Sequence, residues 1–238
     1  IGSLPLGQLM VFPDGSMYRH ARADSANVLN PAQVCVQEAN IVGHGAAAGS
    51  GMSIVTAATG ASTITIKSKS VAITKNQYAE GEMCIQNSAG RGHVYRIKGN
   101  NSAAVSSNCE FQLADGETVV VAMSAASTTV GLRKNPFDRV LLQAAGSARV
   151  GLVAGIPPTS VSANFYFWIC RRGPSAARVS GTVLVESDPV CSDTALAGSV
   201  TAILASSALA TIMEKDKLGY CMMAGSATED TLIYLTLE

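Results

Sequence analysis

Two short segments in which apolar and polar residues alternate constrain this chain more than any other feature. The first covers residues 82–86 and the second covers residues 93–98, while the linking residues 87–92 are rich in Gly, Asn and Ser. Strict alternation places the apolar side chains on one face of a strand, and Gly, Asn and Ser favour tight turns. The sequence therefore predicts a β-hairpin with one buried face.

The same alternation recurs along the chain and predicts many short strands. Turn signals separate them, such as Pro-Asp-Gly-Ser at residues 13–16, where Pro fixes φ and Gly accepts positive φ. Such a series favours an all-β fold, a sandwich or barrel of short antiparallel strands. The break at Pro136 separates two β subdomains, residues 10–135 and residues 136–238. An N-terminal arm, residues 1–9, precedes them.

One segment departs from the strand pattern. Residues 194–213 carry no charge over about the length that spans a bilayer. Gly, Ser and Thr dilute this segment, however, and no Trp or Tyr anchors its ends. Its apolar residues Leu196, Val200 and Ile203 recur at helical spacing. We therefore expect one short buried helix near residues 196–213, and no membrane span.

The charge balance limits the possible partners. Lys+Arg 17 against Asp+Glu 17 gives a net charge of zero, which argues against electrostatic capture of nucleic acid or of an anionic membrane. Charged residues make up 14% of the chain, well below the ~25% of an average domain. So weakly charged a surface favours association. We expect further copies of the chain or another protein to cover it; the alternative is a monomer with a Ser-, Thr- and Gly-rich surface.

The cysteines show neither Cys-x-x-Cys pairs nor the spacing from histidine that zinc sites use. An even number could form three disulfides. Because the chain shows no secretory signal and places two of them in apolar strand patterns, we favour buried free thiols in a reducing compartment. The six positions are Cys35, Cys84, Cys109, Cys170, Cys191 and Cys221.

The sequence contains partial matches to enzyme motifs, but the residues around each match do not fit the structure that the motif requires. The glycine-rich run at residues 43–49 loosely matches a dinucleotide-binding loop, but Gly-Ser-Gly at residues 49–51 would end the helix that must follow. No nucleophile elbow G-x-S-x-G occurs. Glu80 and Glu82 lie on one strand face beside a turn, which favours a solvated pair over facing catalytic carboxylates. We therefore expect a non-enzymatic protein with no catalytic residues, cofactor or metal ligands.

The single tryptophan lies in an aromatic run at residues 164–170, Asn-Phe-Tyr-Phe-Trp-Ile-Cys. A continuous aromatic segment predicts a strand that is buried on both faces or covered by a neighbour. The basic pair Arg171-Arg172 follows it directly. These residues are either two solvated charges at a strand end or a subunit contact, for which the forked donors of arginine are favoured.

The N-terminal arm, residues 1–9, is apolar and has no obvious partner strand within the sequence pattern. Such an arm can add to the sheet edge of a neighbouring protein and gain main-chain hydrogen bonds there. We therefore predict that Leu4, Leu6 and Leu9 belong to an interface. Their burial would contribute ~1.5–3 kcal/mol each in the favourable limit.

Four parts of the chain carry a resemblance when they are taken together. They are residues 6–8 with 13–19, residues 78–98, residues 153–158 with 164–168, and residues 218–219 with 232–235. With these parts the chain, from about residue 6 to 237, resembles a family of tailed-bacteriophage virion proteins encoded among the capsid genes, the head decoration or cement proteins. The family pattern Gln-Thr-Trp-Gly-Pro after the aromatic strand is replaced by Ile-Cys-Arg-Arg-Gly-Pro at residues 169–174, so surface chemistry there is not carried over.

The resemblance implies a function in assembly. It implies a homo-oligomer, a trimer at local threefold positions, that binds the major capsid protein and stabilises the icosahedral head. It also implies assembly in the bacterial host cytoplasm, a final location on the capsid surface, and no catalytic residues. The alternative is a β-domain of a phage tail or fibre that binds or cleaves host carbohydrate, with Trp168, Tyr166 and Glu80 as its residues. Buried aromatic side chains favour the first function, and exposed ones facing carboxylates favour the second.

Overall fold

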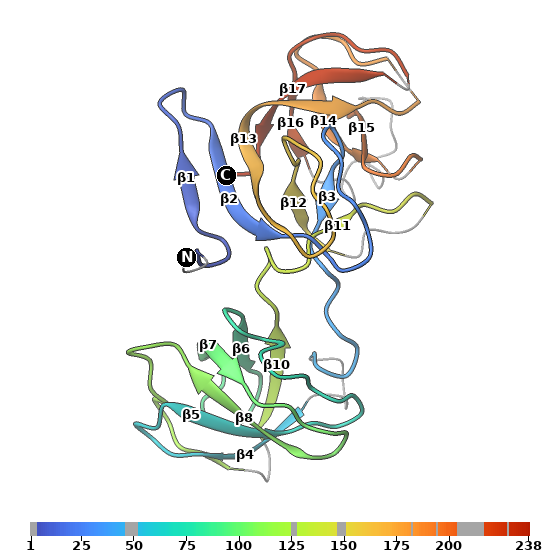
Figure 1. Ribbon diagram of the computed structural model, residues 1–238. Coiled ribbons are helices and arrows are strands. Elements are labelled where there is room, and N and C mark those ends of the chain that lie inside the picture. The colour runs from blue at the N-terminus through green and yellow to red at the C-terminus, as the bar shows by residue number, and fades with distance from the viewer. Residues whose placement is uncertain are drawn as a thin grey trace. The chain divides into compact units, whose positions relative to one another are not determined.

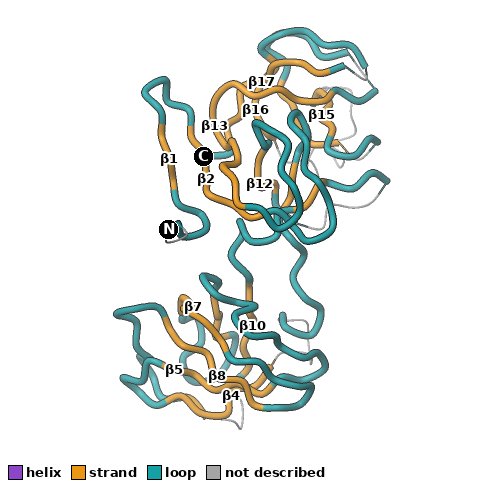
Figure 2. Tube along the Cα trace, viewed as in Figure 1, coloured by secondary structure: helices purple, strands orange, loops and turns teal. Residues whose placement is uncertain are grey.

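All the regular elements in the described part of the chain are β-strands, in antiparallel sheets, as Figures 1 and 2 show. This confirms the predicted all-β fold. The computed structural model describes residues 4–45, 52–124, 128–146, 151–181, 183–193, 195–203, 217–227 and 229–238.

The chain forms two compact units, and one of them is inserted into the other. The split unit consists of residues 1–39 and 136–238, and the inserted unit consists of residues 40–135. The predicted break at Pro136 coincides with the return of the chain to the split unit. The prediction was wrong for residues 10–39, which belong with the C-terminal half, and residues 1–9 are not a separate part. Pairing between strands far apart in sequence causes this arrangement.

The inserted unit is a closed antiparallel barrel of six strands. Its ring runs β10-β6-β7-β8-β5-β4, and a pairing between β10 and β4 closes it, so every strand of the ring has two neighbours. A short strand, β9, adds to β4. The bounds are β4 (Met52–Ala57), β5 (Thr63–Lys67), β6 (Glu82–Ile85), β7 (Val94–Asn100), β8 (Asn108–Leu113), β9 (Met123–Ser124) and β10 (Thr129–Arg133).

The predicted hairpin forms two adjacent strands of this barrel. Met83 lies opposite Tyr95 in the register of β6 with β7, and both side chains are buried, while Glu82 and Cys84 face solvent. Alternating residues of the other strands complete one core, which includes the fully buried Phe111. Each such large apolar side chain contributes about 1.5–3 kcal/mol by its removal from water, which is why the alternation specifies the register.

The split unit contains a seven-stranded sheet of order β1-β2-β13-β17-β16-β14-β15 and a small sheet of order β11-β3-β12. The 13-residue strand β13 pairs with strands from both ends of the chain. Its first part pairs with β2 and its second part pairs with β17. The bounds are β1 (Leu9–Val11), β2 (Met17–Arg22), β3 (Cys35–Val36), β11 (Leu141–Leu142), β12 (Val153–Gly155), β13 (Tyr166–Arg178), β14 (Pro189–Asp193), β15 (Ser199–Ala202), β16 (Lys217–Cys221) and β17 (Asp230–Thr236).

Each face of β13 covers a different core. Cys170 belongs to the cluster formed with β14, β15, β16 and β17, whereas its neighbour Ile169 belongs to a second cluster with Ala21 and Val140. One end of the seven-stranded sheet is linked back to the rest, because Val200 of β15 forms a bridge with Val179 after β13. The other end is β1, whose one strand neighbour in the described part of the chain is β2.

The expected helix near residues 196–213 is wrong in the part that the structure describes. Residues 199–202 form strand β15, in which Val200 and Ala202 are buried and pair with β14. Hydrogen bonding to a neighbouring strand therefore overrides the helical spacing of Leu196, Val200 and Ile203. Residues 204–216 lie outside the described residues. In the described part of the chain, no helix is long and apolar enough to cross a bilayer.

Candidate assembly surface

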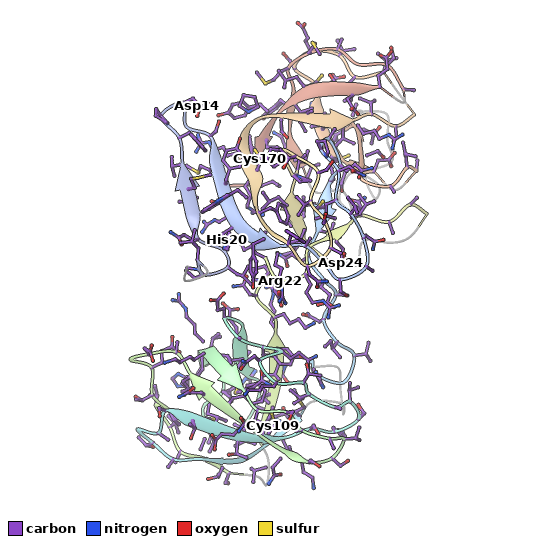
Figure 3. All side chains as sticks on the ribbon, viewed as in Figure 1. Asp14, His20, Arg22, Asp24, Cys109 and Cys170 are labelled. Carbon is purple, nitrogen blue, oxygen red and sulfur yellow. The ribbon has the colours of Figure 1, made fainter. Side chains whose placement is uncertain are left out.

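The hairpin of β1 and β2 presents the free end of the seven-stranded sheet. Its turn is the predicted Pro-Asp-Gly-Ser sequence: Gly15 has a φ of 83°, and Phe12 N–H donates to Ser16 O at 2.9 Å. Asp14, at the tip of the hairpin (Figure 3), accepts hydrogen bonds from the Ser16 amide and hydroxyl, both at 2.9 Å. These two bonds hold the pKa of the Asp14 carboxyl below its usual value, and the bond from the Ser16 amide has the larger effect.

The outer edge of β1 carries main-chain groups that pair with no strand in the described part of the chain. His20 N–H donates to Gln8 O, and Phe12 N–H donates to Ser16 O, so residues 8, 10 and 12 direct their main-chain groups toward β2. In an antiparallel strand the intervening residues point the other way. Leu9 and Val11 therefore direct N–H and C=O groups outward. In Figure 1, β1 lies at the outer margin of its sheet.

The side chains along this edge are apolar and uncharged. Leu9, Val11 and Phe12 are 42%, 52% and 45% exposed. No charged residue occurs before Asp14 in the sequence. Sheet edges in natural proteins are usually protected by charged side chains, proline or a covering element. Among the described residues no strand covers this edge, so it is suited to pairing with another protein. We call residues 9–12 the β1 edge.

The predicted arm is not a free segment where the structure describes it. Gly7 N–H donates to His20 O at 2.8 Å, and Arg19 Nη1 donates to Gly7 O at 2.8 Å. These bonds hold the segment along its own sheet, which corrects the prediction of an extended arm reaching a neighbour. Of the three leucines, Leu4 and Leu9 are exposed and Leu6 is half-buried. Their place in an interface remains a prediction.

Arg171 corrects a second expectation, because its guanidinium is used within the chain. Its side chain is only 15% exposed and donates to Glu238 Oε1 at 2.9 Å and to Ala154 O at 2.9 Å. It also lies over the ring of Phe137, 5.5 Å from the centroid. The N–H groups of this guanidinium that a subunit contact would use already donate to acceptors of the same chain. Arg172, by contrast, is exposed, and its role at an interface remains a prediction.

Glu238 links Arg171 to the hairpin. Its carboxylate accepts from Arg19 Nε at 2.7 Å and from Arg171 Nε at 2.9 Å. Burial alone would raise the pKa of the Glu238 carboxyl, but the hydrogen bonds and charges of both arginines outweigh it and hold that pKa below its usual value. The charge of Arg19, which pairs with Leu9 across the strands, is thereby neutralised beside the β1 edge.

The aromatic strand is more exposed than its sequence predicts. Phe165 and Tyr166 are 65% and 50% exposed, and Phe167 and Trp168 are half-buried, so burial on both faces is wrong for residues 165–168 and holds only for Ile169 and Cys170. The ring of His20 is buried and stacks on Tyr166, with centroids 5.4 Å apart. The exposed rings of Phe165 and Tyr166 are thus available for contact with another molecule. Tyr166 belongs to β13, in the same sheet as the β1 edge.

A second exposed apolar group escaped the sequence analysis. Val183, Val185, Met222 and Met223 are all exposed, and hydrogen bonds from Leu184 to Gly225 and from Ser187 to Cys221 join their segments. The signal was present in the sequence, because Val183 and Val185 alternate with the buried Leu184 and must face away from the core. These residues are a further candidate for contact with another protein.

The cysteines are free, and five of the six are buried. Cys84 is the exception, because β6 alternates and this position faces solvent. Burial raises the pKa of the Cys170 thiol to about 11 and raises that of Cys35 as well. A thiol with a raised pKa is a poor nucleophile, so these side chains act in packing.

Among the described residues, no three His, Cys, Asp or Glu side chains come together as metal ligands. Comparison with known proteins adds no assignment, since no family model, curated protein or solved structure matches the chain. The candidate functional surface is therefore defined by its geometry, an open sheet edge with exposed apolar side chains.

Proposed function

We propose that the protein is a non-enzymatic structural component of a tailed-bacteriophage virion, a capsid decoration protein that binds the major capsid protein and stabilises the head. The observation that carries this proposal is the β1 edge, which combines outward main-chain groups with uncharged apolar side chains. The sequence resemblance to head decoration proteins supports the same assignment. A location on the capsid surface after assembly in the bacterial cytoplasm follows from it.

Strand addition is the mode of binding that fits the β1 edge. A strand from a shell subunit laid along β1 would pair with the outward groups of Leu9 and Val11. Each main-chain hydrogen bond contributes about 0.5–1.5 kcal/mol net, and burial of the exposed apolar side chains adds to it. Each contact is weak, but many copies on one shell, or a trimer that binds as a unit, would sum to firm attachment. The trimer rests on the resemblance alone.

The experiment is a pair of matched variants tested on heads that lack the protein. Val11→Lys places a charge on the β1 edge, whereas Val94→Lys places the same charge on an equally exposed strand position of the inserted unit. Purified wild-type and variant proteins are mixed with the heads and co-sedimented. We expect Val94→Lys to bind as the wild type does and Val11→Lys to lose most binding. Equal binding of both variants would exclude the β1 edge, and failure of the wild type to bind any head would exclude decoration.

A phage tail or fibre domain that binds or cleaves carbohydrate is the second candidate, because the exposed ring of Tyr166 favours it. Trp168 is half-buried, and its ring also contacts His20, with centroids 5.3 Å apart. Glu80 belongs to the inserted unit, where its N–H donates to Ile97 O at 2.8 Å. The carboxylate that the sequence suggested as the partner of Tyr166 and Trp168 therefore does not belong to the unit that contains these two rings.

A further inference from the structure

A polar hollow of about 250 Å³ opens on the outer wall of the barrel in the inserted unit. Glu110 and Gln112 of β8 line one side of it, and both face outward because the intervening Phe111 points into the core. Lys75, Asn76 and Asn101 line the rest of its rim. The lining is thus made of polar side chains, unlike the mostly apolar pockets that bind drug-like molecules.

A glycine creates the space. Gly99 lies opposite Gln112, at an irregularity in the register of β7 with β8. A Cβ atom at this position would lie 2.8 Å from Asn76 Oδ1. Glycine inside a strand often marks a bulge or a place where a ligand approaches the main chain closely. Here the missing side chain leaves the floor of the hollow open.

The floor is held rigid by a buried asparagine. Asn100 Oδ1 accepts from Tyr78 N–H at 3.0 Å, and its Nδ2 donates to Thr74 O at 2.8 Å and to Asn101 O at 2.7 Å. Asn76 N–H in turn donates to Asn100 O at 2.9 Å. The segment that carries Lys75 and Asn76 is therefore fixed before any ligand arrives, which lowers the ordering cost of binding.

The rim presents hydrogen-bonding groups that have no partner in the described part of the chain. The side chains of Lys75, Asn76, Asn101, Glu110 and Gln112 make no hydrogen bond or ion pair with the described residues. Three carboxamides offer donors and acceptors, the carboxylate accepts, and the ammonium donates. The two charges cancel. A small hollow with this lining is matched to a neutral ligand rich in hydroxyl groups, since each hydroxyl both donates and accepts.

We infer that this hollow binds one unit of a neutral saccharide. Glu110 disfavours an anion such as phosphate, while Lys75 and the presence of a single carboxylate disfavour a divalent cation, which prefers several oxygen ligands. The volume lies below the roughly 300–1,000 Å³ of pockets for drug-sized ligands, which suits a single sugar ring. No aromatic ring occurs among the described residues that line the hollow, so affinity would rest on hydrogen bonds, and we expect a dissociation constant of about millimolar. This inference is independent of the virion assignment.

The test is titration of the full-length, isotope-labelled protein followed by amide NMR. The probes are methyl α-D-glucopyranoside, methyl α-D-galactopyranoside and N-acetyl-D-glucosamine, with inorganic phosphate and calcium chloride as the charged competitors. We expect at least one sugar to shift the amides of residues 75–76, 99–101 and 110–112 in a saturable manner. No saturable shift with any sugar up to tens of millimolar, or shifts there with phosphate or calcium instead, would overturn the inference.

Two matched pairs of variants locate the binding. Glu110→Ala removes the carboxylate, and Glu82→Ala removes an exposed glutamate from another strand of the same barrel. Gly99→Ala places a methyl group 2.8 Å from Asn76 Oδ1 and so displaces the end of that side chain, whereas Gly45→Ala meets no described atom within 4 Å. We expect roughly tenfold weaker binding for Glu110→Ala and Gly99→Ala, with unchanged binding for the two controls. Equal affinity in all four variants would contradict the assignment, and their unperturbed spectra would show that each is folded.

Discussion

The two units use the same alternation of apolar and polar residues, yet they treat the ends of their sheets differently. In the inserted unit the pairing of β10 with β4 closes the ring, so every ring strand has a strand neighbour on both sides. In the split unit β1 remains at a free end with apolar side chains exposed. Closure removes the possibility of strand addition. Alternation therefore specifies a core in both units. In the described part of the chain, the pairing of β10 with β4 leaves the ring without a free strand edge, whereas the split unit offers such an edge, at β1, for strand addition.

The largest expected effect contrasts two phenylalanines. Phe111 is fully buried in the barrel, whereas Phe165 is 65% exposed in the split unit. Phe111→Ala should lower the free energy of unfolding by about 3–5 kcal/mol, because it removes core contacts and leaves a cavity. Phe165→Ala should change it by no more than about 0.5 kcal/mol. Urea unfolding followed by fluorescence measures both. A large cost for Phe165→Ala would mean that this ring is covered by another chain in solution.

An intermediate effect concerns Glu238, which the split unit holds between two arginines. Its pKa is lower in the folded protein than in the unfolded chain, so its stabilisation is present above about pH 4.5, the ordinary value for Glu. It is lost as the pH falls through the folded-state pKa. Glu238→Gln should cost roughly 1–3 kcal/mol at neutral pH, as expected for hydrogen bonds to a charged group.

The measurement is the free energy of unfolding of wild type and Glu238→Gln from neutral to acidic pH. The difference between the two proteins should shrink as the carboxyl of the wild type becomes protonated. A difference that stays constant below the folded-state pKa would show that packing, and not the charge, supplies the effect. Arg172→Gln serves as the control, because Arg172 is exposed beside Arg171.

The smallest effect on stability concerns the thiols. Cys84 is exposed on the barrel wall, while Cys35 is buried in the split unit and its pKa is raised by that burial. An alkylating reagent should modify Cys84 rapidly in the native protein and the other five only after denaturation. Modification of Cys84 should change stability by less than about 0.5 kcal/mol. Mass spectrometry of the peptides would identify the modified sites, and equally rapid modification of Cys35 would indicate that the split unit opens readily.

Local features of the sequence predicted local features of the fold. The hairpin of β6 and β7 follows from alternation and a short turn, both of which lie within one segment. The insertion could not be predicted in this way, since it depends on the pairing of His20 with Trp168, residues from opposite halves of the chain. Alternation does not say which strand is the neighbour of which. The length and break signals alone therefore assigned residues 10–39 to the wrong unit.

The surface residues show the same limit. The pairing of β1 with β2 across the Pro-Asp-Gly-Ser turn follows from the sequence and is confirmed, but the open outer edge of β1 was not predicted. Arg171 was misjudged because its partner, Glu238, is 67 residues away in the sequence. The hollow was missed because it depends on Gly99, a strand glycine whose importance becomes apparent only when Asn76 lies beside it.

The insertion also sets an order of events during synthesis on the ribosome. The first 39 residues emerge before the strands β13 and β17 that complete their sheet, and the whole barrel is translated in between. The two ends of the barrel segment lie together, since Leu132 N–H donates to His44 O at 2.9 Å. Folding of the barrel thus turns a long flexible loop into a short connection and lowers the entropy cost of joining β2 to β13. The folded barrel would therefore act as a short link between the two parts of the split unit.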